Sequence, residues 1–157
     1  MMKLCKDNRV VQEPDNIGPK YRACFRHMRG VIMKIGVPME PDGETRVAIV
    51  PGSMKKLMKS GFEVVVQKGA GSNANHSDSE YTDAGATIGN RDDVLSCGII
   101  ISIRIPEVSE LSKGQIVACV ADPFRHPEKV QACIDGGITL LSICLLYTSP
   151  SPRDLRK

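Results

Sequence analysis

The segment Gly98 to Ile105, GIIISIRI, is the most strand-like part of this 157-residue chain. Its isoleucines are β-branched and only Arg104 is charged, which is typical of a strand buried on both faces of a parallel sheet. Pro106 ends the segment, because proline has no amide hydrogen to donate to a neighbouring strand. We therefore predict that residues 98–105 form a buried central strand.

Strand and helix patterns alternate on both sides of this central strand, about every ten to fifteen residues, as they do in α/β domains. Apolar runs predict further strands, and apolar residues at helical spacing predict the helices between them. The strands are expected at 34–38, 62–67, 115–121 and 138–143, and the helices at 54–59, from 77 to about 85, at 91–96 and at 127–134. The sequence thus predicts an α/β fold in which a parallel sheet has flanking helices.

Several residues are expected to cap the predicted helices. Ser77 and Glu80 have the spacing of a capping box, in which each side chain accepts a hydrogen bond from the other residue's amide. Ser53 is expected to cap the helix at 54–59. Pro127 is expected at the first helical position of the last helix, with His126 before it at the N-cap.

Composition and charge exclude several classes of partner. The chain has 21 Lys and Arg against 18 Asp and Glu, a net charge of +3, and basic residues alternate with acidic ones. We therefore expect no nucleic-acid partner. None of the six cysteines forms a C-x-x-C pair or a close Cys/His ligand set, so no metal site is expected. No apolar run approaches the ~20 residues of a membrane helix, so we expect no direct membrane insertion.

Two terminal regions lack the alternating pattern. Residues 1–32 show no helical or strand periodicity, and acids among their basic residues are unlike a mitochondrial presequence. We interpret them as a disordered or non-native extension before Met33. Residues 144–157, CLLYTSPSPRDLRK, contain a Ser-Pro-Ser-Pro run that cannot continue a strand or helix, and we interpret them as an unstructured, non-native tail.

The region 33–143 contains a series of characteristic sequence blocks. They are MKIGVP, GETRVAIVP, KKLMKSGFEVVVQKGAGS, SEYTDAGATI, IIISIRIP, QIVACVADP and HPEKVQACIDGGITLLSI. In their order and spacing these blocks resemble the N-terminal domain of the alanine dehydrogenase and NAD(P)⁺ transhydrogenase family.

This resemblance implies a two-domain subunit, in which a flavodoxin-like sheet is followed by a Rossmann domain that holds NAD(H). The chain resembles the first domain alone, so the resemblance implies an incomplete protein that binds no cofactor by itself. For the full-length protein it implies a homodimer and membrane-embedded transhydrogenase subunits or domains as partners. It also implies a place at the cytoplasmic face of the bacterial inner membrane or on the mitochondrial matrix side.

The aligned positions favour one branch of the family. Alanine dehydrogenases use a Lys shortly after the central strand and a His after the following strand, and these positions fall on Arg104 and Asp122. An arginine cannot donate a proton near pH 7, because its pKa is too high. Pro123 and Pro127 match the transhydrogenase pattern, whereas Ser102 stands where the family usually has Lys.

We therefore favour a truncated transhydrogenase α subunit that is inactive alone. Its full-length form would transfer hydride from NADH to NADP⁺, coupled to proton translocation. Two alternatives stay open. One is alanine dehydrogenase, which deaminates alanine to pyruvate with NAD, and the other is a non-catalytic interaction module.

Three residues are candidates for the substrate or cofactor cleft, and no residue is assigned a catalytic role. Arg46 follows a turn and precedes a strand, so its guanidinium could hold a carboxylate or phosphate through two parallel bonds. In alanine dehydrogenases the matching Arg grips the substrate carboxylate. The alternative for Arg46 is an ion pair with Glu44 or Glu40. Arg104 and Asp122 lie at the ends of neighbouring predicted strands, where α/β sheets place ligands. The alternative for Arg104 is a solvated charge at the strand end, and an Arg104–Asp122 pair across neighbouring strands would be structural.

The segment Gly69 to Ala74 matches G-x-G-x-x-A after a predicted strand. A dinucleotide fingerprint must open a helix, so that free amides meet the pyrophosphate. Here the next helix start is marked only at Ser77, after further polar residues. We therefore interpret residues 69–74 as a connecting loop.

Overall fold

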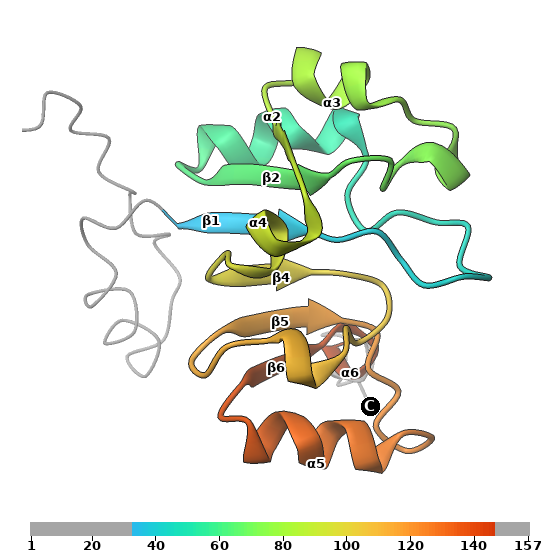
Figure 1. The fold of residues 1–157 in the computed structure, drawn as a ribbon, viewed down its shortest axis with the longest axis vertical. Helices are drawn as coiled ribbons and strands as arrows, with labels where there is room; N and C mark the ends of the chain where they lie inside the picture. Colours follow the sequence, from blue (N-terminus) through green and yellow to red (C-terminus); the bar gives the residue numbers. More distant parts are fainter. Residues whose placement is uncertain (1–32, 147–157) are drawn as a thin grey trace, which may run out of the picture.

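A computed structural model describes residues 33–146 of the chain, which form a six-stranded sheet with helices on both faces (Figure 1). Every pair of neighbouring strands is parallel. The strands are β1 Lys34–Val37, β2 Glu63–Gln67, β3 Thr87–Gly89, β4 Ile99–Ile101, β5 Ile116–Cys119 and β6 Thr139–Ser142. The predicted parallel α/β fold is therefore confirmed.

The strand order is β3-β2-β1-β4-β5-β6. The described part of the chain enters the sheet in its middle at β1, winds outward to β3, and then crosses back to β4 before winding outward the other way. This is the strand order of doubly wound dinucleotide-binding sheets, and flavodoxin has the related order 2-1-3-4-5. In both orders the reversal point, here between β1 and β4, is where such sheets bind ligands.

Successive residues of a strand point to opposite faces of the sheet, and two core clusters form as a result. Ile35 and Val37 of β1 belong to one cluster, with Met54 and Tyr81 from the helices on that face. Ile100 of β4 belongs to the other cluster, on the opposite face. The helices are α2 Pro51–Lys59, α3 Asp78–Asp83, α4 Arg91–Leu95, α5 Pro127–Asp135 and α6 Ile143–Leu146, with short 3₁₀ turns at Ser72–Ala74 and Val108–Glu110.

The predicted helix ends agree with the structure in most places. The Ser77–Glu80 capping box is present at the start of α3, with both reciprocal hydrogen bonds formed. Pro127 occupies the first turn of α5, and His126 is its N-cap residue, although its side chain makes no capping bond. The helix predicted at 54–59 instead begins at Pro51, because a proline at the first position needs no amide partner.

Three sequence predictions need correction. The predicted central strand 98–105 is confined to Ile99–Ile101. No strand follows Arg46, because residues 45–50 form an irregular segment that leads into α2. The edge strand β3, Thr87–Gly89, was not predicted, since three residues are too few to establish an alternating pattern.

The predicted terminal regions are only partly described. Ile143–Leu146 form the short helix α6, so the first three residues of the predicted unstructured tail are helical. The remainder of that tail and the predicted extension at 1–32 lie outside the described residues.

Gly36 allows helix α4 to pack directly on the sheet. A Cβ atom at this position would overlap the carbonyl oxygen of Val94 and lie 3.1 Å from the side chain of Ile100. Val94 is fully buried, so the clash would fall on backbone in the interior of the domain. The close approach of β1 and α4 therefore requires glycine.

We expect Gly36→Ala to lower the free energy of unfolding by about 1–3 kcal/mol, the usual cost of overpacking a core. Gly98→Ala is the matched control, because a Cβ atom there would meet nothing within 4 Å. Urea unfolding followed by circular dichroism measures both variants. Equal stability of the two variants would contradict the close packing of α4 on β1.

Candidate functional site

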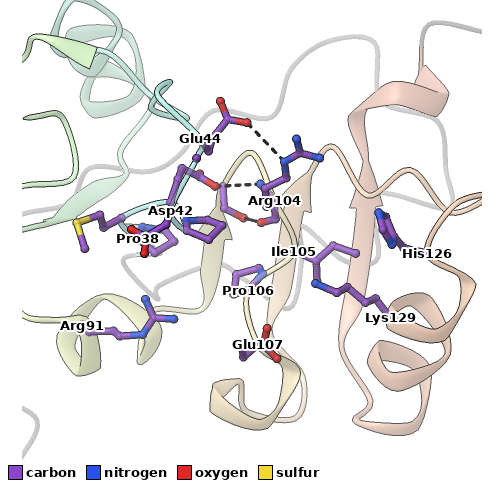
Figure 2. Close-up of a pocket in the computed structure, with 15 residues that line it drawn as sticks. Pro38, Asp42, Glu44, Arg91, Arg104, Ile105, Pro106, Glu107, His126 and Lys129 are labelled. Carbon is purple, nitrogen blue, oxygen red and sulfur yellow. Dashed lines mark hydrogen bonds and ion pairs between the residues drawn. The ribbon is translucent and has the colours of Figure 1, made fainter. Parts of the chain in front are cut away.

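A cavity of about 720 Å³ lies at the carboxyl ends of β1 and β4, at the reversal point of the sheet (Figure 2). One wall is the loop after β1, and another is the segment after β4. The helices α4 and α5 supply the rest. The lining residues are Pro38, Met39, Glu40, Pro41, Asp42, Gly43, Glu44, Arg91, Ser102, Arg104, Ile105, Pro106, Glu107, His126 and Lys129. Because ligands of open α/β sheets bind at this position, the cavity is the candidate site.

Glu40 joins the two loops that form the cavity. Its side chain is buried, and its carboxylate accepts hydrogen bonds from the backbone amides of Ile103 at 2.6 Å and Arg104 at 3.0 Å. Ser102 is also buried and donates its hydroxyl to the carbonyl of Arg104 at 2.7 Å. The segment after Ile101 thus finds hydrogen-bond partners in the cavity wall, which explains why β4 is shorter than predicted.

Glu44 is the second buried carboxylate of the loop after β1. Its two oxygens accept hydrogen bonds from Arg46 Nε at 2.6 Å and Arg46 Nη2 at 2.7 Å. Arg104 Nε lies 3.5 Å from the same carboxylate. The hydrogen bonds from Arg46 lower the pKa of Glu44 to about 2, with smaller contributions from the charges of Arg46 and Arg104. The bond to Glu44 likewise raises the pKa of Arg46. Glu44 is therefore an anion at any physiological pH.

The three candidates from the sequence lie in different surroundings. Arg104 lines the cavity, and its guanidinium points toward Glu44 (Figure 2). Arg46 lies beside the cavity but is outside its lining, and the predicted alternative, an ion pair with Glu44, is present. Asp122 is also outside the lining and has a left-handed backbone conformation, with φ of 41°.

The Arg104–Asp122 pair considered from the sequence is replaced by two other contacts. Arg104 contacts Glu44, as described above, and Asp122 contacts Arg125, with Oδ2 and Nε 3.5 Å apart. The carbonyl of Asp122 accepts hydrogen bonds from the amides of Arg125 and His126. Asp122 thus shapes the turn before α5, and the structure brings only Arg46 and Arg104 together.

Seven lining residues carry charge or a titratable group and were not among the candidates, namely Glu40, Asp42, Glu44, Arg91, Glu107, His126 and Lys129. Glu40 stands in the turn sequence EPDGE, where a turn residue gave no reason to expect burial. Arg91 projects from α4 and forms two hydrogen bonds, of 2.9 and 2.6 Å, with Glu110. His126 and Lys129 come from the start of α5. Their convergence depends on the order of strands, which the sequence did not specify.

The glycine-rich loop at 69–74 does not fit a pyrophosphate. The amide of Gly69 donates to the carboxylate of Asp78 at 2.9 Å, so a negative charge already occupies this loop. The loop continues into a 3₁₀ turn at Ser72–Ala74, and α3 starts only at Asp78. Its amides therefore do not form the free helix N-terminus that a dinucleotide needs.

Among residues 33–146, no group of three or more His, Cys, Asp or Glu side chains could hold a metal ion. Among the same residues, no helix has the length and apolar character needed to span a bilayer.

The fold and the cavity define a doubly wound α/β domain with a polar crevice at its reversal point. The chain belongs to the family described as the alanine dehydrogenase/PNT N-terminal domain, whose family model matches residues 36–151.

Curated relatives come from both branches of this family. The chain is 34% identical over 117 residues to the NAD(P) transhydrogenase subunit alpha of Cereibacter sphaeroides, a match that covers 71% of this chain and 22% of that protein. It is 33% identical over 128 residues to the alanine dehydrogenase of Mycobacterium tuberculosis strain H37Rv, covering 78% of this chain and 33% of that protein. The chain therefore spans between a fifth and a third of the length of these relatives.

Solved structures of both branches share the fold. The transhydrogenase from Sinorhizobium meliloti has a TM-score of 0.67 and 34% identity, covering 69% of this chain and 33% of that chain. An L-alanine dehydrogenase also has a TM-score of 0.67, with 26% identity and coverage of 70% and 32%.

We expect the substitution Arg46→Gln to raise the pKa of Glu44 from about 2 toward its ordinary value of 4.5. The hydrogen bonds of Arg46 are the main cause of the low value, so their loss should remove most of the shift. An NMR titration of the glutamate side-chain carboxyl carbons measures the pKa of Glu44. Arg91→Gln is the control, because Arg91 pairs with Glu110 instead. An unchanged Glu44 midpoint in Arg46→Gln would contradict the assigned pairing.

The same pairing predicts how stability depends on pH. A carboxyl whose pKa is lower in the folded state stabilises the fold fully above its unfolded pKa, and this contribution is lost as the pH falls. For Glu44 the loss should therefore occur between about pH 4.5 and 2. Thermal melts of wild type and Arg46→Gln across this range should converge toward the acid end.

Proposed function

We propose that this chain forms one wall of the substrate cleft in the α subunit of a proton-translocating NAD(P)⁺ transhydrogenase. The full-length enzyme would transfer hydride from NADH to NADP⁺, and the chain alone would be inactive. The observation that carries this proposal is the identity of the residues that follow β4 and β5. Arg104, which lines the cavity, and Asp122, which lies outside its lining, occupy the positions assigned to the Lys and His of alanine dehydrogenases. A guanidinium can orient an anion but cannot exchange a proton.

One pair of solved structures supports the same choice, whereas the curated relatives are nearly equally similar, at 34% identity for the transhydrogenase subunit and 33% for the alanine dehydrogenase. At equal TM-score and nearly equal coverage, the chain is 34% identical to the S. meliloti transhydrogenase and 26% identical to the L-alanine dehydrogenase. Hydride transfer between two nicotinamides needs positioning and charge complementarity from the protein. A cavity wall that carries paired arginines and carboxylates can supply both the positioning and the charge complementarity.

We further propose that NAD(H) is held by the remainder of the full-length subunit. This proposal is supported by the poor fit of the 69–74 loop to a pyrophosphate, because the amide of Gly69 already donates a hydrogen bond to Asp78. It is also supported by the length of the transhydrogenase relatives, of which the chain spans 22–33%. In this proposal the subunit is a homodimer that works with membrane-embedded subunits, at the cytoplasmic face of the bacterial inner membrane or on the mitochondrial matrix side.

Alanine dehydrogenase is the second candidate, and one observation favours it. His126 and Lys129 both line the cavity, so two side chains able to exchange protons are present near Arg104. They come from α5 instead of the positions that match the family's Lys and His. A dehydrogenase of this kind would need a rearranged acid–base pair.

Two chimeric proteins would separate these candidates. Residues 33–143 replace the matching segment in the C. sphaeroides transhydrogenase α subunit and, separately, in the M. tuberculosis alanine dehydrogenase. We expect NADH-dependent reduction of NADP⁺ in the first chimera. We expect the second to deaminate alanine at least about 10²-fold more slowly than its parent, because general acid–base catalysis supplies a factor of that order or more.

A rescue experiment is the control for the second chimera. Arg104→Lys combined with Asp122→His should recover alanine deamination if the fold is intact. Deamination at the parental rate without these substitutions would favour the alanine dehydrogenase candidate. A transhydrogenase chimera that folds and assembles but transfers no hydride would contradict the main proposal.

A titration of the purified 157-residue chain with NADH tests the cofactor proposal. We expect no saturation below about 1 mM, since a site that lacks a pyrophosphate cradle loses the charge-assisted bonds that anchor a dinucleotide. Fluorescence of the reduced nicotinamide reports binding, and the intact S. meliloti transhydrogenase serves as the positive control. Micromolar binding of NADH by the chain alone would contradict the proposal that the remainder of the full-length subunit holds NAD(H).

A further inference from the structure

The carboxylate of Glu44 is shared by two arginines that are far more exposed than it is. The side chain of Glu44 is 8% exposed, while those of Arg46 and Arg104 are 67% and 55% exposed. Arg46 forms the two short bonds, and Arg104 Nε lies 3.5 Å away on the same carboxylate. A buried anion thus stands between two cations that solvent or a ligand can reach.

The hydrogen bonds from Arg46 to Glu44 use the N–H groups that an anionic ligand would need. A guanidinium grips a carboxylate or phosphate through two parallel N–H groups, and Glu44 occupies Nε and Nη2 of Arg46 in this way. Arg104 lines the cavity, whereas Arg46 does not. In this state the anion-binding side of Arg46 is filled by the protein's own carboxylate.

We infer that Glu44 is a positioning residue that competes with anionic ligands for Arg46 and moves toward Arg104 when a ligand binds. The ligand class is a small anion with a carboxylate or phosphate group, which offers Arg46 the same pair of oxygens. Arg104 already lies beside the Glu44 carboxylate, so the move leaves no buried charge without a partner, a situation that would be strongly unfavourable. The inference extends the proposed function by naming what sets anion affinity at this site.

The ionisation of Glu44 determines how a ligand could replace it at Arg46. Because the pKa of Glu44 is lowered to about 2, the carboxylate is not released by protonation at physiological pH. Displacement by a second anion is the remaining route. The affinity of the site for anions should therefore be limited by the Glu44–Arg46 contact.

The test is a titration of the 157-residue chain with inorganic phosphate, followed by the NMR signals of the arginine Nε–H groups. Glu44→Gln keeps the size of the side chain and removes its charge. We expect this variant to bind phosphate about five- to tenfold more tightly than wild type, the order expected for the loss of one competing ion pair. The largest shift should occur at Arg46 Nε–H.

Glu63→Gln is the matched control. Glu63 pairs with Lys34, with Oε2 and Nζ 3.5 Å apart, neither residue lines the cavity, and the loss of Glu63 changes the net charge equally. We expect its phosphate affinity to stay within about twofold of wild type, since an exposed charge at a distance is screened by salt. An equal gain in phosphate affinity in Glu44→Gln and Glu63→Gln would show that net charge alone causes the effect and would overturn the inference.

A second variant keeps the test decisive if Glu44→Gln does not fold. Glu44→Asp retains the charge but shortens the side chain, so it loosens the contact with Arg46. We expect its phosphate affinity to exceed that of wild type, and unchanged affinity would overturn the inference. Phosphate binding is measured without nucleotide or hydride transfer. Failure of the transhydrogenase chimera would therefore refute the proposed function alone, and failure here would refute the role of Glu44 alone.

Discussion

The two hydrogen bonds that Glu40 accepts hold the candidate site together. They connect the loop after β1 to the segment after β4, across 63 and 64 residues of sequence. Hydrogen bonds to a charged partner contribute about 1.5–3 kcal/mol each, and more is lost when a buried group is left without a partner. Without Glu40, the amides of Ile103 and Arg104 would have to find acceptors elsewhere. Arg104 stands beside Glu44 because this contact fixes its backbone.

The contents of the loop after β1 distinguish this domain from dinucleotide-binding domains with the same strand order. In those domains a tight glycine-rich turn after the first strand places a helix N-terminus on the pyrophosphate. Here the loop runs from residue 38 to residue 50 before α2 begins, and it carries the buried carboxylates of Glu40 and Glu44. Negative charge in this loop repels a phosphate. The loop after β1 thus holds arginines in place instead of binding a pyrophosphate.

The sequence was sufficient to predict elements with strong local determinants. The Ser77–Glu80 box and Pro127 fix helix starts through bonds made within a few residues, and both were located correctly. The parallel class of the sheet followed from alternating apolar runs. Strand lengths were predicted poorly. The strand β4 ends before Ile103 and Arg104, whose amides donate hydrogen bonds to Glu40, a residue distant in sequence. β3 depends on its partner β2 in the same way.

The candidate site shows the same limit. Arg46 was chosen for its place after a turn and Arg104 for its place at a strand end, and the structure brings both to one carboxylate. Asp122 was chosen on the same ground as Arg104, but a strand end does not specify where a side chain lies, and Asp122 contacts Arg125 outside the cavity lining. His126 and Lys129 reach the cavity only because β5 lies next to β4, a fact of topology.

Both core clusters contribute to the geometry of the cavity, so its walls depend on the whole domain. The cluster around Ile35 and Met54 supports the face on which α2 packs. The cluster on the other face contains Leu95 and Cys133, and it anchors the helices that present Arg91 and Lys129. A domain whose interior is packed as densely as a crystal transmits small displacements instead of absorbing them. The spacing between the arginines and the buried carboxylates is therefore a property of the complete sheet, and the polar chemistry of the cavity rests on the apolar packing beneath it.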